Sequence, residues 1–218
     1  MEIVWYGHSC FRLVERGFAT VVTDPFDSAV AGYSPLKLKS DVVTVSSSDQ
    51  AHSFTKAVKG DPYEINGPGE YEIGNVFITG MQTSSHKSED QATRNTMYVF
   101  DYGSLTVAHL GRMTQVPSQS AIEELGTIHI ALVPVGDGSS LNASKAAEVI
   151  SLIEPNIVIP MQYETPYSKM ALDPLEKFLK EMGLTQLETL ESYKITGASL
   201  LSEEETHVIA LEPKLTSG

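Results

Sequence analysis

Short apolar runs, several of them alternating with polar residues, predict that strands dominate the first half of the chain. The runs are rich in β-branched and aromatic residues, and clusters of Gly, Pro, Asn and Asp typical of turns separate them. The expected strands cover residues 3–6, 11–14, 19–23, 41–45, 63–65, 70–73, 76–78, 97–100 and 105–108. Because short turns join the first three runs, we expect these to form a meander in which chain neighbours pair.

In the second half, segments with helical spacing of apolar residues alternate with further strands. The spacing predicts helices over residues 117–125, 143–153 and 174–182, with Asn142 as the N-cap of the second and Gly183 ending the third. Strands are expected at residues 130–135, 157–159 and 207–211, and residues 84–95 read as a polar loop. This order predicts one domain over residues 1–218, with two packed sheets and outer helices. An ordinary doubly wound sheet would not open with so many hairpins.

Composition fits a globular domain and argues against several classes of partner. The 218 residues are 41% hydrophobic and 20% charged, which is enough apolar material for a core. The net charge of −13 repels phosphate backbones and anionic lipids, so we expect neither a nucleic-acid nor a membrane partner. The single cysteine, Cys10, cannot form an intramolecular disulfide and is expected in the core. Together with the lack of an apolar leader or long apolar run, this predicts a cytoplasmic protein.

Seven short segments, in order along the chain, resemble those of the metallo-β-lactamase superfamily and its small lactonase-like, metal-dependent hydrolases. The first reads Trp-Tyr-Gly-His-Ser-Cys-Phe-Arg at residues 5–12, and the last reads Ile-Pro-Met-Gln-Tyr at residues 159–163. The others are residues 23–26, 41–46, 67–71, 109–111 and 133–136. The resemblance implies an α/β (α+β) fold, a four-layer αββα sandwich with a dinuclear metal site at one edge between the sheets.

The superfamily's metal ligands come from the signature His-x-His-x-Asp-His, a further histidine, a bridging aspartate and a last histidine. Nitrogen and oxygen ligands of this kind suit two zinc ions. The corresponding positions here are, in chain order, Ser47, Asp49, Ala51, His52, His86, Arg112 and Gln162. Arginine has no lone pair to offer and repels a metal ion. A catalytic zinc usually takes about three protein ligands, so the resemblance implies a degenerate metal site.

These departures leave three functions open. In the first, the chain is a pseudoenzyme that needs no cofactor and binds a small ligand or a partner protein in the old cleft. The alternative is a hydrolase of an ester, lactone or phosphodiester with one divalent ion, zinc, manganese or iron, on Asp49, His52 and His86. In the third, the useful part is an outer surface, such as a homo-oligomer interface.

Further residues of the expected pocket have two interpretations each. His8 either lies at the pocket floor or is a hydrogen-bonded turn histidine, and Asp24 either supports the metal positions or caps a turn. His109, at a strand end, is expected to be buried and hydrogen-bonded. We hypothesise that the Arg112 guanidinium takes the place of the second metal and pairs with Asp49 or Asp24.

Overall fold

The computed structural model describes residues 1–83, 94–197 and 205–216, and in these ranges the strands form two large mixed sheets and one small pair. From edge to edge, the first sheet contains β15 (Tyr193–Lys194), β1 (Glu2–Gly7), β2 (Cys10–Val14), β3 (Val21–Thr23), β5 (Val42–Thr44) and β7 (Tyr63–Ile65). β1, β2 and β3 pair antiparallel, as the meander predicts, whereas β3, β5 and β7 run parallel. The small pair joins β4 (Leu38–Lys39) to β6 (Val58–Lys59).

The second sheet contains, in order, β14 (Glu188–Leu190), β16 (His207–Leu211), β13 (Ile157–Met161), β12 (Ile130–Pro134), β11 (Thr106–His109), β10 (Thr96–Asp101), β9 (Val76–Gln82) and β8 (Gly69–Ile73). The half of this sheet that comes first in the chain, from β8 to β11, is an antiparallel meander. From β11 onward the strands run parallel, because helices provide the crossovers.

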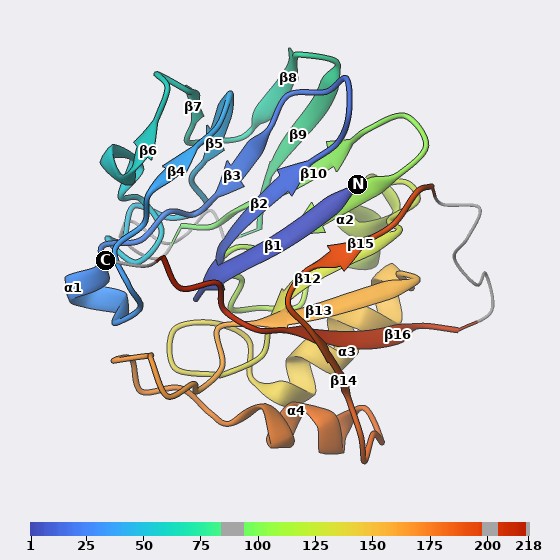
Figure 1. Cartoon of the computed structure of the whole chain (residues 1–218). Helices are drawn as coiled ribbons and strands as arrows, with labels where there is room; N and C mark the ends of the chain where they lie inside the picture. Colours follow the sequence, from blue (N-terminus) through green and yellow to red (C-terminus); the bar gives the residue numbers. More distant parts are fainter. Residues whose placement is uncertain (84–93, 198–204, 217–218) are drawn as a thin grey trace.

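The helices lie outside the two sheets (Figure 1). They are α1 (Ser28–Ala31), the single 3₁₀ turn η1 (Thr55–Ala57), α2 (Gln119–Glu123), α3 (Ala143–Ile153) and α4 (Leu175–Glu181). α3 packs on β12 and α4, and it begins at Asn142, whose side chain accepts a hydrogen bond from the Lys145 N–H. No helix in the described ranges has the length and apolar character needed to cross a bilayer.

One core fills the space between the sheets. Trp5 and Phe11 from the first sheet share a single buried cluster with Ile78 and Phe100 from the second. A second cluster, which contains Cys10, Phe26 and Tyr33, covers the outer face of the first sheet. The αββα sandwich and the core position of Cys10 are therefore confirmed. The layer over the first sheet consists of the short helix α1 and extended chain rather than long helices.

Candidate functional site

Strands of both sheets end at the same edge of the sandwich, and each brings a polar side chain there. His8 follows β1, Asp24 follows β3 and Gln162 follows β13, while His109 is the last residue of β11. All four residues are buried. The fold thus brings together residues that are far apart in the sequence, at the edge that the resemblance implies.

Three of these residues have left-handed backbone conformations, which residues other than glycine adopt at a cost. The φ angle is 49° for His8, 39° for Asp24 and 55° for Gln162. Such strain persists only where the surrounding structure holds it, and it clusters at functional sites. Four other described residues share this geometry outside the site, so it is the combination with burial of the side chains that distinguishes this edge.

The signature segment forms a compact turn after β5. Asp49 Oδ1 accepts a hydrogen bond from the Ala51 N–H at 2.7 Å, and the Asp49 carbonyl accepts one from the His52 N–H at 2.8 Å. The turn directs the buried His52 ring inward, with Nδ1 3.9 Å from Asp49 Oδ1. The His52 side chain holds the pKa of Asp49 well below its usual value, and the Ala51 N–H and the Arg112 charge act in the same direction. Asp49 is therefore ionised.

His8 lies beside His52, with ring centroids 4.8 Å apart and an interplanar angle of 65°. Both ring nitrogens of His8 are buried without a hydrogen-bond partner. Burial lowers the pKa of His8 well below its usual value, and the neighbouring His52 lowers it further. His8 is therefore a neutral imidazole that offers a lone pair to the site. The imidazole makes no hydrogen bond within the described residues, whereas the His8 carbonyl accepts one from Trp5 Nε1 at 3.0 Å.

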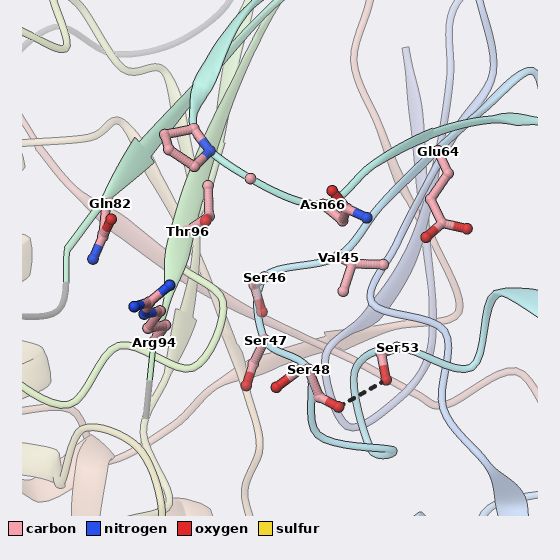
Figure 2. Close-up of a pocket in the computed structure, with 12 residues that line it drawn as sticks. Val45, Ser46, Ser47, Ser48, Ser53, Glu64, Asn66, Gln82, Arg94 and Thr96 are labelled. Carbon is pink, nitrogen blue, oxygen red and sulfur yellow. Dashed lines mark hydrogen bonds between the residues drawn. The ribbon is translucent and has the colours of Figure 1, made fainter. Parts of the chain in front are cut away.

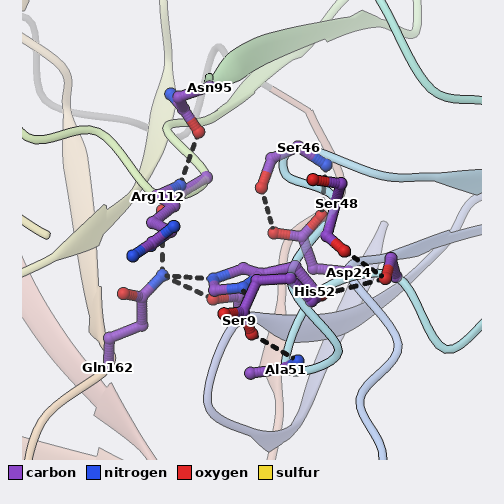
Figure 3. A network of polar contacts seen from close by, with 12 residues as sticks. Ser9, Asp24, Ser46, Ser48, Ala51, His52, Asn95, Arg112 and Gln162 are labelled. Atoms are coloured by element: carbon purple, nitrogen blue, oxygen red, sulfur yellow. Dashed lines mark hydrogen bonds and ion pairs between the residues drawn. The ribbon is translucent and has the colours of Figure 1, made fainter. Parts of the chain in front are cut away.

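The Gln162 amide stands at the position of the superfamily's last histidine (Figure 3). Its Nε2 donates to the Gly111 carbonyl at 2.9 Å and to Ser9 Oγ at 2.5 Å, and it lies 3.4 Å from His52 Nε2. A carbonyl oxygen can only accept, so the amide nitrogen is the atom on this side. Because two amide hydrogens face three acceptors, the long contact to His52 is the weakest. Gln162 therefore presents a donor, and no lone pair, toward His52.

Asp24 and His109 hold the walls of the site. The Asp24 carboxylate accepts hydrogen bonds from Ser46, from the backbone N–H at 2.7 Å and from Oγ at 2.5 Å, which ties the end of β3 to the start of the signature segment. His109 is buried, as expected, with Nε2 2.9 Å from the Ser9 carbonyl. Of the two interpretations of Asp24, these contacts favour the structural one.

Arg112 brings a positive charge to the same place. Its backbone N–H donates to Asn95 Oδ1 at 2.6 Å (Figure 3). The charge lowers the pKa of both Asp49 and His8. The Arg112 charge therefore supports the ionisation of Asp49. A direct ion pair with Arg112 stays a prediction.

The described residues do not fit a dinuclear metal centre. Across residues 1–83, 94–197 and 205–216, no three His, Cys, Asp or Glu side chains converge in a way that could hold a metal ion. Ser47, Arg112 and Gln162 replace ligands with a hydroxyl, a cation and an amide donor. His86, the third residue of the predicted one-metal set, lies outside the described residues. Of the predicted one-metal set, the described residues therefore include two ligands, Asp49 and His52.

A pocket of about 410 Å³ opens beside the signature segment (Figure 2). The residues that line it include Ser47, Ser48, Asn66, Gln82, Arg94 and Thr96. Among the predicted site residues that the structure describes, Ser47 alone lines this pocket. His8, Asp24, His52, His109 and Gln162 are buried beside it. Asn66, Gln82 and Thr96 were missed, because they lie at the ends of three different strands, β7, β9 and β10, and share no motif with the signature.

Comparisons with known proteins agree with this architecture. A family model described as a Beta-lactamase superfamily domain matches residues 2–162. A metal-dependent hydrolase from Thermoplasma acidophilum is 30% identical over 204 residues, covering 82% of this chain and 89% of that protein. One from Methanopyrus kandleri is 29% identical over 231 residues, covering 89% and 100%.

A solved structure shows the same fold at similar identity. The crystal structure of a candidate Zn-dependent hydrolase of the metallo-β-lactamase superfamily from Thermotoga maritima has a TM-score of 0.78 and 32% identity, and the match covers 97% of this chain and 99% of that one. The names of these relatives say that they depend on a metal. This conflicts with our expectation that the chain needs no cofactor. The chain therefore belongs to the beta-lactamase superfamily and has the metallo-β-lactamase fold.

Proposed function

We propose that this chain is a hydrolase of a small ester, lactone or phosphodiester, and that it uses one divalent metal ion rather than two. The observation that carries the proposal is the pair formed by the ionised Asp49 and the buried His52, whose Nδ1 has no hydrogen-bond partner. Names of relatives that match nearly the whole chain support it. This is the alternative that the sequence left open, and it replaces our first expectation of an inactive protein.

Asp49 and His52 would hold the ion, with His86 as the third ligand that the resemblance implies. When bound, such an ion lowers the pKa of a water molecule and polarises a carbonyl or phosphoryl oxygen. The residues around this pair have positioning roles. Asp24 fixes the start of the signature segment through Ser46, and the Ala51 N–H fixes the Asp49 carboxylate. His8 places a neutral imidazole beside His52.

Metal analysis combined with turnover tests this proposal. We expect about one equivalent of zinc, manganese or iron to survive dialysis, and we expect turnover of p-nitrophenyl acetate, a simple lactone or bis-p-nitrophenyl phosphate. His52→Gln should abolish both retention and turnover. His207→Gln, an exposed histidine outside the site, should change neither. Two equivalents per chain would contradict the one-ion proposal, and retention that survives His52→Gln would contradict the ligand assignment.

A second candidate is a binding protein without catalysis, which the donor character of Gln162 and the charge of Arg112 favour. Absence of retained metal and of turnover after metal addition, in a protein that still binds a small ligand, would support this candidate over the first.

The alignment that underlies both candidates can be tested by restoring the superfamily's ligands. The variant with Ser47→His, Asp49→His, Ala51→Asp, Arg112→Asp and Gln162→His should take up two zinc ions, because the second position then gains lone pairs and loses a cation. If the variant folds, by circular dichroism, and takes up no zinc, the alignment is wrong.

A further inference from the structure

Ser47 carries a buried hydroxyl that no residue in the described ranges satisfies. The residue is 4% exposed, lines the pocket, and its Oγ has no hydrogen-bond partner. A buried polar group without a partner costs stability, so each such group calls for an explanation. A ligand in the pocket would supply the missing partner.

Arg94 provides an unneutralised positive charge at the same pocket. Its side chain is exposed, and it has no hydrogen bond or ion pair within the ranges that the structure describes. Guanidinium groups bind phosphate and carboxylate groups through paired hydrogen bonds.

The two sides of the pocket differ in charge. Arg94 lies at one side and Glu64 at the other, with Ser46, Ser47 and Ser48 between them (Figure 2). Glu64 would repel a second anionic group, but its carboxylate can accept hydrogen bonds from hydroxyls. The volume, about 410 Å³, falls in the lower part of the range of small-molecule pockets.

We propose that this pocket binds a small hydroxylated anion, with its phosphate or carboxylate on Arg94 and a hydroxyl hydrogen-bonded to Ser47 Oγ. Further hydroxyls reach the neutral lining and, at the far end, Glu64. The proposal rests on the proposed function, since it names the class of molecule that the same site would act on. It needs no metal ion, because none of the contacts involves Asp49 or His52.

Calorimetric titration of the full chain in EDTA tests the binding separately from catalysis. Glucose 6-phosphate and gluconate serve as the phosphate and carboxylate probes, and glucose is the neutral control. We expect at least one of the two anions to bind more than tenfold more tightly than glucose, because a charge-assisted hydrogen bond is worth about a factor of ten or more. Affinity should fall as salt is raised. Comparing the two anions identifies the preferred group.

Matched variants locate the contacts. Arg94→Gln should weaken anion binding about tenfold or more, Arg94→Lys should retain part of it, and Arg16→Gln, an exposed arginine that does not line the pocket, should leave it unchanged. Ser47→Ala should weaken binding severalfold without lowering the melting temperature, because it removes a hydroxyl that is unsatisfied in the free protein.

Equal binding of glucose and both anions, no binding of either anion, or full affinity in Arg94→Gln would each overturn the proposal. Anion binding in EDTA, without metal retention or turnover in the earlier assays, would contradict the hydrolase proposal and support this inference. Turnover of neutral esters without anion binding would support the hydrolase proposal and contradict this inference.

Discussion

Replacing Gln162 with leucine tests whether its amide holds the candidate site together. Gln162 is 1% exposed, and its Nε2 donates to the Gly111 carbonyl at 2.9 Å and to Ser9 Oγ at 2.5 Å. Leucine has nearly the same volume and no donor. The change therefore removes the hydrogen bonds while leaving the packing largely intact.

The size of the effect follows from counting buried groups. Two acceptors lose their donor, at about 1–3 kcal/mol each. The substitution also removes Gln162 Oε1, which is buried without a partner. Removing this one unsatisfied atom stabilises the protein by about 1–3 kcal/mol, which offsets one of the two losses. The net loss in the free energy of unfolding is about 1–3 kcal/mol. In a protein of this length, each kcal/mol lowers the melting temperature by about 2–4 °C.

Urea denaturation followed by circular dichroism measures this loss. Gln119→Leu is the matched control, because Gln119 is exposed on α2 and donates only to the exposed Glu123. The control should stay within about 0.5 kcal/mol of the wild type. A Gln162→Leu protein as stable as the control would refute the reasoning, since the amide would then contribute nothing that leucine cannot replace.

Two further predictions concern the histidine in β11 and the glycine that faces Gln162. Burial lowers the pKa of His109 from 6.5, so just below pH 6.5 the unfolded chain binds more protons than the folded protein. The free energy of unfolding should therefore decrease as pH falls from 7 toward 5, by up to about 1.4 kcal/mol per pH unit for this group. Urea denaturation at several pH values should show that the free energy of unfolding depends less on pH in His109→Gln than in the wild type. The exposed His207→Gln should keep the wild-type dependence. Gly136→Ala would place a methyl group 2.0 Å from the Gln162 carbonyl oxygen and should cost about 3 kcal/mol or prevent folding, whereas Gly67→Ala meets open space and should cost less than about 0.5 kcal/mol in the same assay.

The sequence predicted the elements whose signal is local. The helix expected over residues 143–153 has those bounds, with Asn142 as its cap, because apolar spacing and a capping side chain are properties of the segment itself. The strands β4, β6, β14 and β15 were missed, because two or three residues are too few to show a period. The parallel pairing of β3 with β5 was also missed. Turn residues report where a chain reverses, but they carry no information about which strands meet after a longer connection.

The site was predictable as far as the superfamily's positions extend. The resemblance to the superfamily's motifs identified Asp24, His52 and Gln162, and His8 was placed by its position after a strand. The direction of the Gln162 amide could not be predicted, because it depends on the Gly111 carbonyl, which another strand end positions. The unpartnered nitrogens of His8 likewise follow from burial by distant segments.

The strained backbone bears on whether this edge still has a function. His8, Asp24 and Gln162 hold left-handed conformations with φ between 39° and 55°, at about 1–3 kcal/mol each. Together they cost about 3–9 kcal/mol, which is comparable to the whole stability of a typical domain, about 5–15 kcal/mol. A protein whose useful part was only its outer surface would gain stability by relaxing them. All three direct buried polar side chains to the same edge, beside a pocket with an unsatisfied hydroxyl. Strain combined with buried polar side chains and an unsatisfied hydroxyl is what the proposed ligand site predicts, whereas the same strain at Glu154 only ends a helix.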